Sequence, residues 1–164
     1  MMSDVENTMV DETFETMDMA QKDLYLNFHI GSEDFGIDIA HVIEIIGIQR
    51  ITAVPDMPHY MQGVINLRGK VISVMDVRLR FDMEQREYDD RTCVVVVNVG
   101  EDTVGLIVDR VNEVVEISSN QIQPVPQLQL NEDYIMGLGK LNDEVKILID
   151  VDRLINEGDF VEAA

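Results

Sequence analysis

The sequence predicts an all-β protein made of two small β-barrels packed together, with short helical turns between strands. The first observation is a series of short runs rich in Val and Ile, bounded by Gly, Asp and Ser, which is typical of strands. The second is that one order of glycines and acidic residues occurs twice, which indicates an internal duplication. Each copy offers roughly five strands, and so small a sheet must curl into a barrel or cover one face.

The first copy contains a hairpin within residues 63–76, where apolar runs flank a turn at Arg68-Gly69. Gly69 can adopt the positive φ that a tight hairpin turn needs. Asp76 is suited to capping a short helical turn over residues 77–81. Further strands are expected at residues 24–30, 35–39 and 42–46, whereas Pro55 and Pro58 stiffen an irregular connection.

The second copy follows the first with two constant offsets. An offset of 69 carries residues 25–36 onto 94–105 and Val42-x-Glu44 onto Val111-x-Glu113. An offset of 74 carries Gly63, Leu67, Val71 and Asp76 onto Gly137, Leu141, Val145 and Asp150. We therefore expect subdomains at about 24–88 and 91–156, preceded by an acidic, disordered segment (1–23) and followed by a tail (157–164).

The charge balance restricts the possible partners. With 12 basic and 32 acidic residues, the net charge is −20, which argues against nucleic acid and anionic membrane surfaces. The acidic start does not resemble a secretory signal, and no apolar run approaches the roughly 20 residues that span a bilayer. The only cysteine, Cys93, lies in a strand-like run of valines, so no disulfide can form within the chain. A soluble cytoplasmic protein is expected.

Two charged residues have both a structural and a functional interpretation. Arg68 is either a solvated turn residue or a planar donor that grips a carboxylate of a partner. The second copy has the ordinary turn Asn142-Asp-Glu144 at this hairpin, and this asymmetry favours a function for Arg68. Glu44, inside an apolar run, is either an outward solvated position or a specific polar contact.

Patterns typical of catalysis or metal binding are missing from the sequence. His29, His41 and His59 lack the spacing of metal ligands, and no serine has the context of a nucleophile elbow. Gly137-Leu-Gly139 lacks the third glycine of a dinucleotide-binding loop. We therefore expect no enzyme, no metal and no cofactor.

Several motifs resemble the CheW family of bacterial and archaeal chemotaxis coupling proteins, over about residues 24–155. They are Val42-x-Glu44-Ile45, Thr52-x-Val54-Pro55, Gly63-Val-x-Asn-Leu-Arg-Gly-x-Val-x-x-Val-x-Asp-x-Arg78, Val104-Gly-Leu-Ile-Val-Asp109-x-Val111, Ile122-x-Pro-x-Pro126 and Gly137-x-Gly139. The resemblance implies two intertwined, SH3-like, five-stranded barrels. It also implies a non-enzymatic adaptor that links the cytoplasmic tips of methyl-accepting chemoreceptors to the regulatory domain of the histidine kinase CheA, in arrays at the inner face of the membrane.

The resemblance also implies which residues touch each partner. Val42, Glu44 and Arg68 would contact the receptor, beside a groove between the barrels. The groove would be lined by Ile39, Gly63, Val104, Gly105 and Val111.

For the kinase, the resemblance implies exposed strand positions such as Val71 and Val94 and the surface near Leu128. Two alternatives stay open. One is a β-barrel protein that binds a small ligand in the groove, and the other is a piece of a larger kinase or of an adaptor fused to a receiver domain.

Overall fold

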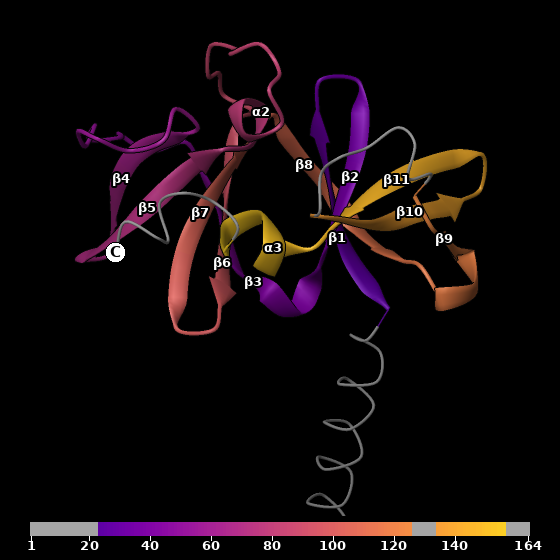
Figure 1. Cartoon of the computed structure of the whole chain (residues 1–164). Helices are drawn as coiled ribbons and strands as arrows, with labels where there is room; N and C mark the ends of the chain where they lie inside the picture. The colour runs from indigo at the N-terminus through magenta and orange to yellow at the C-terminus, as the bar shows by residue number, and fades with distance from the viewer. Residues whose placement is uncertain (1–22, 126–133, 157–164) are drawn as a thin grey trace, which may run out of the picture.

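A computed structural model of the chain describes residues 23–125 and 134–156, which form two β-sheets and a few short helices (Figure 1). The strands are β1 (Leu24–Ile30), β2 (Glu33–Asp38), β3 (Val42–Gly47), β4 (Met61–Leu67), β5 (Lys70–Asp76), β6 (Cys93–Val99), β7 (Asp102–Val108), β8 (Arg110–Glu116), β9 (Ile122–Gln123), β10 (Ile135–Leu141) and β11 (Glu144–Ile149). The helices are η1 (Ile39–His41), α2 (Val77–Arg80), η2 (Ser119–Gln121) and α3 (Val151–Asn156). The expectations for Leu128, for the tail and for all of the acidic segment except Asp23 lie outside the described residues.

The predicted duplication is confirmed by the strand boundaries. The offset of 69 carries β1 onto β6, and the offset of 74 carries β4 onto β10. Even the irregularities repeat, because β4 and β10 both change register before a glycine, Gly63 in one and Gly137 in the other. Asp76 caps α2 as expected, accepting a hydrogen bond of 3.0 Å from the backbone of Arg78.

The two sheets do not coincide with the two copies. One sheet has the order β8-β1-β2-β11-β10-β9, and the other has the order β3-β6-β7-β5-β4. The first hairpin of each copy, β1–β2 or β6–β7, therefore lies in the sheet that the other copy completes. Both hairpins join their sheets through equivalent parallel pairs, β2 with β11 and β7 with β5. The boundary near residues 88–91 separates the copies in sequence but not the sheets in space.

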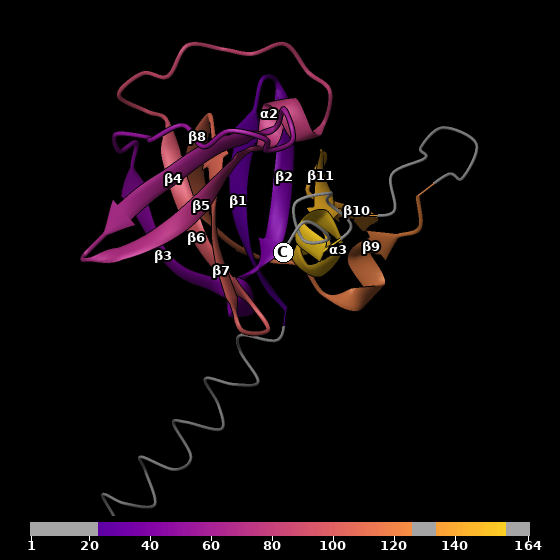
Figure 2. The same cartoon turned by 60° about the vertical axis from the view of Figure 1, so that its left-hand side comes forward.

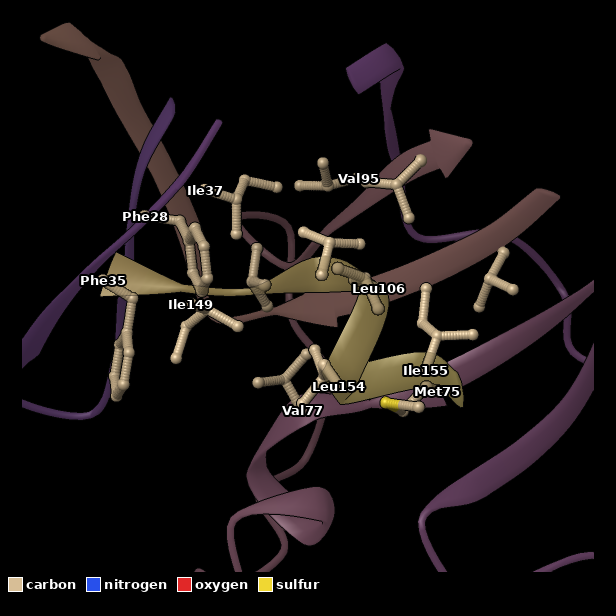
Figure 3. Packing of buried hydrophobic residues seen from close by; sticks show 14 of the residues in the cluster. Phe28, Phe35, Ile37, Met75, Val77, Val95, Leu106, Ile149, Leu154 and Ile155 are labelled. Carbon is tan, nitrogen blue, oxygen red and sulfur yellow. The ribbon is translucent and has the colours of Figure 1, made fainter. Parts of the chain in front are cut away.

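The largest hydrophobic core lies between the two sheets. Residues of both sheets meet there, including Phe28, Ile37, Val95 and Leu106, and α3 inserts Leu154 and Ile155 among them (Figure 3). A second apolar cluster is formed by side chains of the five-stranded sheet, and a smaller one involves side chains of the six-stranded sheet. The sheets are thus held together chiefly by apolar burial at their interface.

Because both sheets share this core and exchange hairpins, we expect them to unfold in one transition. Amide hydrogen exchange of β4 and β10 should report the same opening free energy. Leu154→Ala should lower that free energy by about 2–5 kcal/mol in both sheets, since it opens a cavity in the shared core. Val71→Ala, at an exposed strand position, should change it by less than about 0.5 kcal/mol. A Leu154→Ala variant that loosens one sheet alone would contradict the shared core.

Candidate interaction site

The corner between β4 and β5 places an arginine in an unusual backbone conformation. Arg68 has φ +52° and Gly69 has φ +85°, so both central residues of this two-residue turn are left-handed. The Asn66 side chain accepts a 2.8 Å hydrogen bond from the Gly69 backbone and tightens the turn. The equivalent of Arg68 in the second copy is Asn142, with φ +57°. Asparagine tolerates this region, whereas arginine pays about 1 kcal/mol to occupy it, so the turn itself gives no reason for an arginine.

The Arg68 guanidinium forms an ion pair with Glu44 of β3. In the order of the five-stranded sheet, β3 and β4 are the two outer strands, so this pair joins opposite edges as the sheet curls. The Glu44 side chain is 24 % exposed and that of Arg68 is 71 % exposed. The hydrogen bond with Glu44 and the charge of its carboxylate raise the pKa of Arg68 above its ordinary value. Glu44 is therefore paired within the chain and mostly covered, not fully solvated, while its contact with a partner stays a prediction.

On β3, the charged Glu44 is mostly covered, whereas its apolar neighbours Ile43 and Ile45 are exposed. The pairing of β3 with β6 changes register between Val42 and Glu44, and such a bulge re-aims the side chains that follow it. Glu44 consequently turns toward Arg68, while Ile43 and Ile45 are exposed. The result is an outer strand that presents two isoleucines beside a charged pair.

The other residues that the resemblance assigns to receptor binding or its groove lie deeper. Ile39, Val42 and Val111 are partly buried and pack against the main core, and Val104 belongs to that core. Gly63 and Gly105 are buried. A Cβ on Gly63 would lie 2.0 Å from the Thr52 carbonyl oxygen, so this glycine allows the close approach of two backbones.

Of the described residues expected to face the kinase, one is exposed and one is buried. Val71 is 64 % exposed on β5, as expected. Val94 is fully buried, so the expectation that it lies at an exposed strand position is wrong. Both faces of β6 are covered. Val94 and Val96 belong to the second apolar cluster, whereas Val95 and Val97 belong to the main core between the sheets. A continuous valine run is typical of a strand buried on both sides.

A second ion pair, to which no sequence pattern assigned a role, links the two copies. Arg78 of α2 donates to both oxygens of Asp109, with Nε–Oδ1 of 2.8 Å and Nη2–Oδ2 of 2.5 Å. The backbone of Gly31 and the side chain of Arg86 also donate to Oδ2, at 2.7 and 3.3 Å. Burial alone would raise the pKa of Asp109, but these hydrogen bonds and the charges of both arginines hold it below its ordinary value. The family motifs contain both residues, but nothing in the sequence pairs them.

Arg80, also on α2, lies over two aromatic rings. The Arg80 guanidinium carbon is 5.2 Å from the ring centre of Tyr60 and 4.8 Å from that of Tyr134. Its Nε donates to the backbone oxygen of Leu154, which ties α2 to α3. These contacts stabilise the arrangement of the two short helices.

The comparisons with known proteins agree with this fold and these motifs. The family model described as "CheW-like domain" matches residues 24–159. The chain belongs to the CheW family. A chemotaxis protein CheW of Klebsiella aerogenes is 37 % identical over 134 residues, which are 80 % of this chain and 81 % of that protein. A chemotaxis protein CheW of Helicobacter pylori is 32 % identical over 134 residues, which are 81 % of each chain.

A solved CheW structure has the same fold. The crystal structure of the scaffolding protein TtCheW from Thermoanaerobacter tengcongensis has a TM-score of 0.76 and 33 % identity, covering 80 % of this chain and 91 % of that one. Membership of the CheW family makes this chain a chemotaxis scaffold or adaptor protein with two packed SH3-like subdomains.

Neither a cluster of metal ligands nor a membrane-spanning helix is found in the described residues. Within residues 23–125 and 134–156, no three His, Cys, Asp or Glu side chains gather as metal ligands. Over the same ranges, no helix has the length and apolar character needed to cross a membrane. The charged pair of Arg68 and Glu44 presents guanidinium and carboxylate groups at the surface, beside the exposed Ile43 and Ile45.

Removing the Asp109 charge should destabilise the CheW fold at neutral pH. We expect Asp109→Asn to cost about 3–5 kcal/mol, because Arg78 is left partly buried without its carboxylate. A carboxylate with a lowered folded pKa stabilises above its unfolded pKa of about 3.9 and loses that contribution as the pH falls further. The difference between wild type and Asp109→Asn, measured by urea unfolding, should therefore shrink below about pH 4. Asp90→Asn, a matched change on an exposed residue, should show neither effect.

Proposed function

We propose that this chain couples methyl-accepting chemoreceptors to the histidine kinase CheA as a non-enzymatic adaptor, in the cytoplasm at receptor arrays. The observation that carries the proposal is the Arg68–Glu44 pair, held at a strained hairpin corner beside the exposed Ile43 and Ile45. The turn needs a left-handed residue but not an arginine, since Asn142 occupies the equivalent corner. Keeping an arginine in this strained conformation supports a functional role for its side chain. Family membership supplies the chemotaxis setting.

The receptor tip is a helical hairpin, and such a partner can dock by an apolar ridge with charged residues at its margin. Ile43 and Ile45 offer apolar contact along β3. In the described residues, Arg68 makes a side-chain hydrogen bond only with Glu44, so most of its five donors can reach a receptor carboxylate. Glu44 restrains the guanidinium before binding, which lowers the entropy cost of the contact.

The buried residues of the expected receptor site act indirectly in this proposal. Val104 and Gly105 are buried residues of β7, and Gly63 allows the chain to pass close to Thr52. Ile39, Val42 and Val111 form the partly exposed margin of the main core. Substitutions at these positions change the shape of the receptor surface through the fold.

The proposed kinase contacts lie beside one hairpin corner of each copy, and the corner of the first copy is also the one that carries Arg68. Val71 and its equivalent in the second copy, Val145, are both exposed near hairpin corners, so the duplication presents two similar apolar positions. A regulatory domain built from the same kind of barrel could pair with such positions. Individual contacts of this size are weak, and an array adds them through multivalency.

The alternative of a small ligand held between the barrels lacks support in the packing. The space between the sheets is occupied by the main core, in which Val104 takes part. Calorimetry with a receptor-tip fragment and with candidate metabolites separates the two functions. Binding of metabolites between the barrels, without receptor or kinase binding, would exclude the adaptor role.

Replacing Arg68 by asparagine tests the receptor contact without disturbing the turn. Asn142 occupies the equivalent corner, so Arg68→Asn should fold with an unchanged or higher melting temperature. Calorimetric titration with a receptor-tip fragment should show roughly tenfold weaker binding or worse, as expected when one member of an interfacial charge pair is removed.

Two further variants separate geometry from charge. Arg68→Lys keeps the charge but not the planar fork and should also weaken binding. Lys70→Asn removes a nearby positive charge and should leave binding within about twofold, since an exposed rim charge contributes little. Equal affinities of wild type and Arg68→Asn would contradict the contact. A pull-down from the native cytoplasm, scored together for chemoreceptors and a CheA-type kinase, tests the coupling as a whole.

A further inference from the structure

A cavity of about 270 Å³ lies where the connection between α2 and β6 passes the end of β1 and the start of β8. Figure 2 shows this connection as a long arc above the strands. The cavity is lined by His29, Gly31, Arg86, Arg91, Asp109 and Arg110. It contains none of the residues of the proposed receptor or kinase contacts, so a ligand in this cavity does not depend on the coupling function.

The lining is basic in a strongly acidic protein. It contains three arginines, whereas the whole chain has 12 basic residues against 32 acidic ones. Arg91 and Arg110 form no ion pair with any residue in the described part of the chain. Arg86, by contrast, forms ion pairs with both Asp89 and Asp109. Two positive side chains thus face one cavity without a counter-charge, although acidic residues are abundant elsewhere.

Asp109 does not neutralise Arg91 or Arg110, because other groups already occupy both of its oxygens. Its Oδ1 accepts from Arg78, and its Oδ2 accepts from Arg78, Gly31 and Arg86. The paired, partly buried Arg78 guanidinium already balances the single negative charge. The cavity therefore keeps an excess of positive charge after the ion pair is counted.

The walls of the cavity are held in place by contacts outside it. His29 is fixed between Asp34, with Nδ1–Oδ1 of 2.8 Å, and the side chain of Asn112. The connection that carries Arg86 and Arg91 is anchored by Tyr88, whose hydroxyl donates to the buried Asp76 at 2.7 Å. Asp89 closes a turn by accepting from the backbone of Arg91 at 2.9 Å. The arginines are therefore presented from a defined frame.

The duplication provides a comparison within the same chain. The offset of 69 that relates the copies places Ala40-His41 at the position of Asp109-Arg110, and Asn98 at that of His29. These equivalent positions carry neither the acidic member of the ion pair nor an arginine. The basic cluster is consequently a property of one copy and not a requirement of the fold.

We propose that this cavity binds a small multivalent anion bearing phosphate or carboxylate groups, gripped by Arg86, Arg91 and Arg110. Guanidinium groups bind both kinds of oxyanion through paired hydrogen bonds. The volume is below the range of about 300–1,000 Å³ that is usual for drug-sized ligands, which favours an anion of the size of pyrophosphate or citrate. The bound anion links the α2–β6 connection to the start of β8.

The test is calorimetric titration of the full chain with pyrophosphate and with citrate, in buffers whose ionic strength is matched with sodium chloride. We expect saturable binding of at least one anion, and a melting temperature that rises with its concentration. The double variant Arg91→Gln/Arg110→Gln should weaken this binding at least about tenfold. The double variant Arg50→Gln/Lys70→Gln removes the same charge outside the cavity and should bind as wild type does.

The fold of the variant is checked in the absence of anion. Because Arg91 and Arg110 form no ion pairs within the described ranges, removing their like charges should leave the melting temperature unchanged or higher. A marked decrease would show that the arginines serve the fold and would overturn the proposal. Equal stabilisation by sodium chloride, or equal loss of binding in both double variants, would also overturn it by indicating general screening. Binding of a polyglutamate peptide but of neither small anion would overturn it in favour of a protein partner.

Discussion

The structure depends on apolar burial between two sheets that each contain strands from both copies of a repeat. Neither copy has a complete sheet of its own, because the hairpins β1–β2 and β6–β7 are exchanged. The main core then seals the two sheets together, with α3 inserted between them. This frame fixes the positions of short surface features whose local sequences could not order themselves. The strained corner at Arg68 and the basic cavity beside Asp109 both rely on it.

Local structure was largely predictable from the sequence, because it depends on residues close in the chain. The hairpin corner at Arg68-Gly69, the cap at Asp76 and the two offsets of the repeat all follow from spacing and residue type, and the structure confirms them. The exchange of hairpins does not follow from spacing, because the same strands could also pair within one copy. The resemblance to a family implied intertwined barrels where the residue pattern alone gave two consecutive subdomains.

The candidate site shows where sequence patterns stop being informative. A register change in β3 turns Glu44 inward and two isoleucines outward, which reverses the orientation that hydrophobicity favours. Val94 belongs to a run of valines buried on both faces, so periodicity could not tell an exposed position from a buried one. Arg78 and Asp109 lie 31 residues apart, and only the assembled fold brings them together. These three cases depend on pairing between distant strands and not on local preference.

The exchange of hairpins also bears on how the two copies can differ. Two separate chains of one copy each would have to find one another to complete their sheets, and their folding would then depend on concentration. A covalent link makes the encounter intramolecular and removes that dependence. It also removes the symmetry that identical subunits impose, under which every residue occurs at two equivalent places. One hairpin corner can therefore keep the relaxed Asn142 while the equivalent corner bears the strained Arg68. The two copies then present different side chains to partners at the same place in the fold.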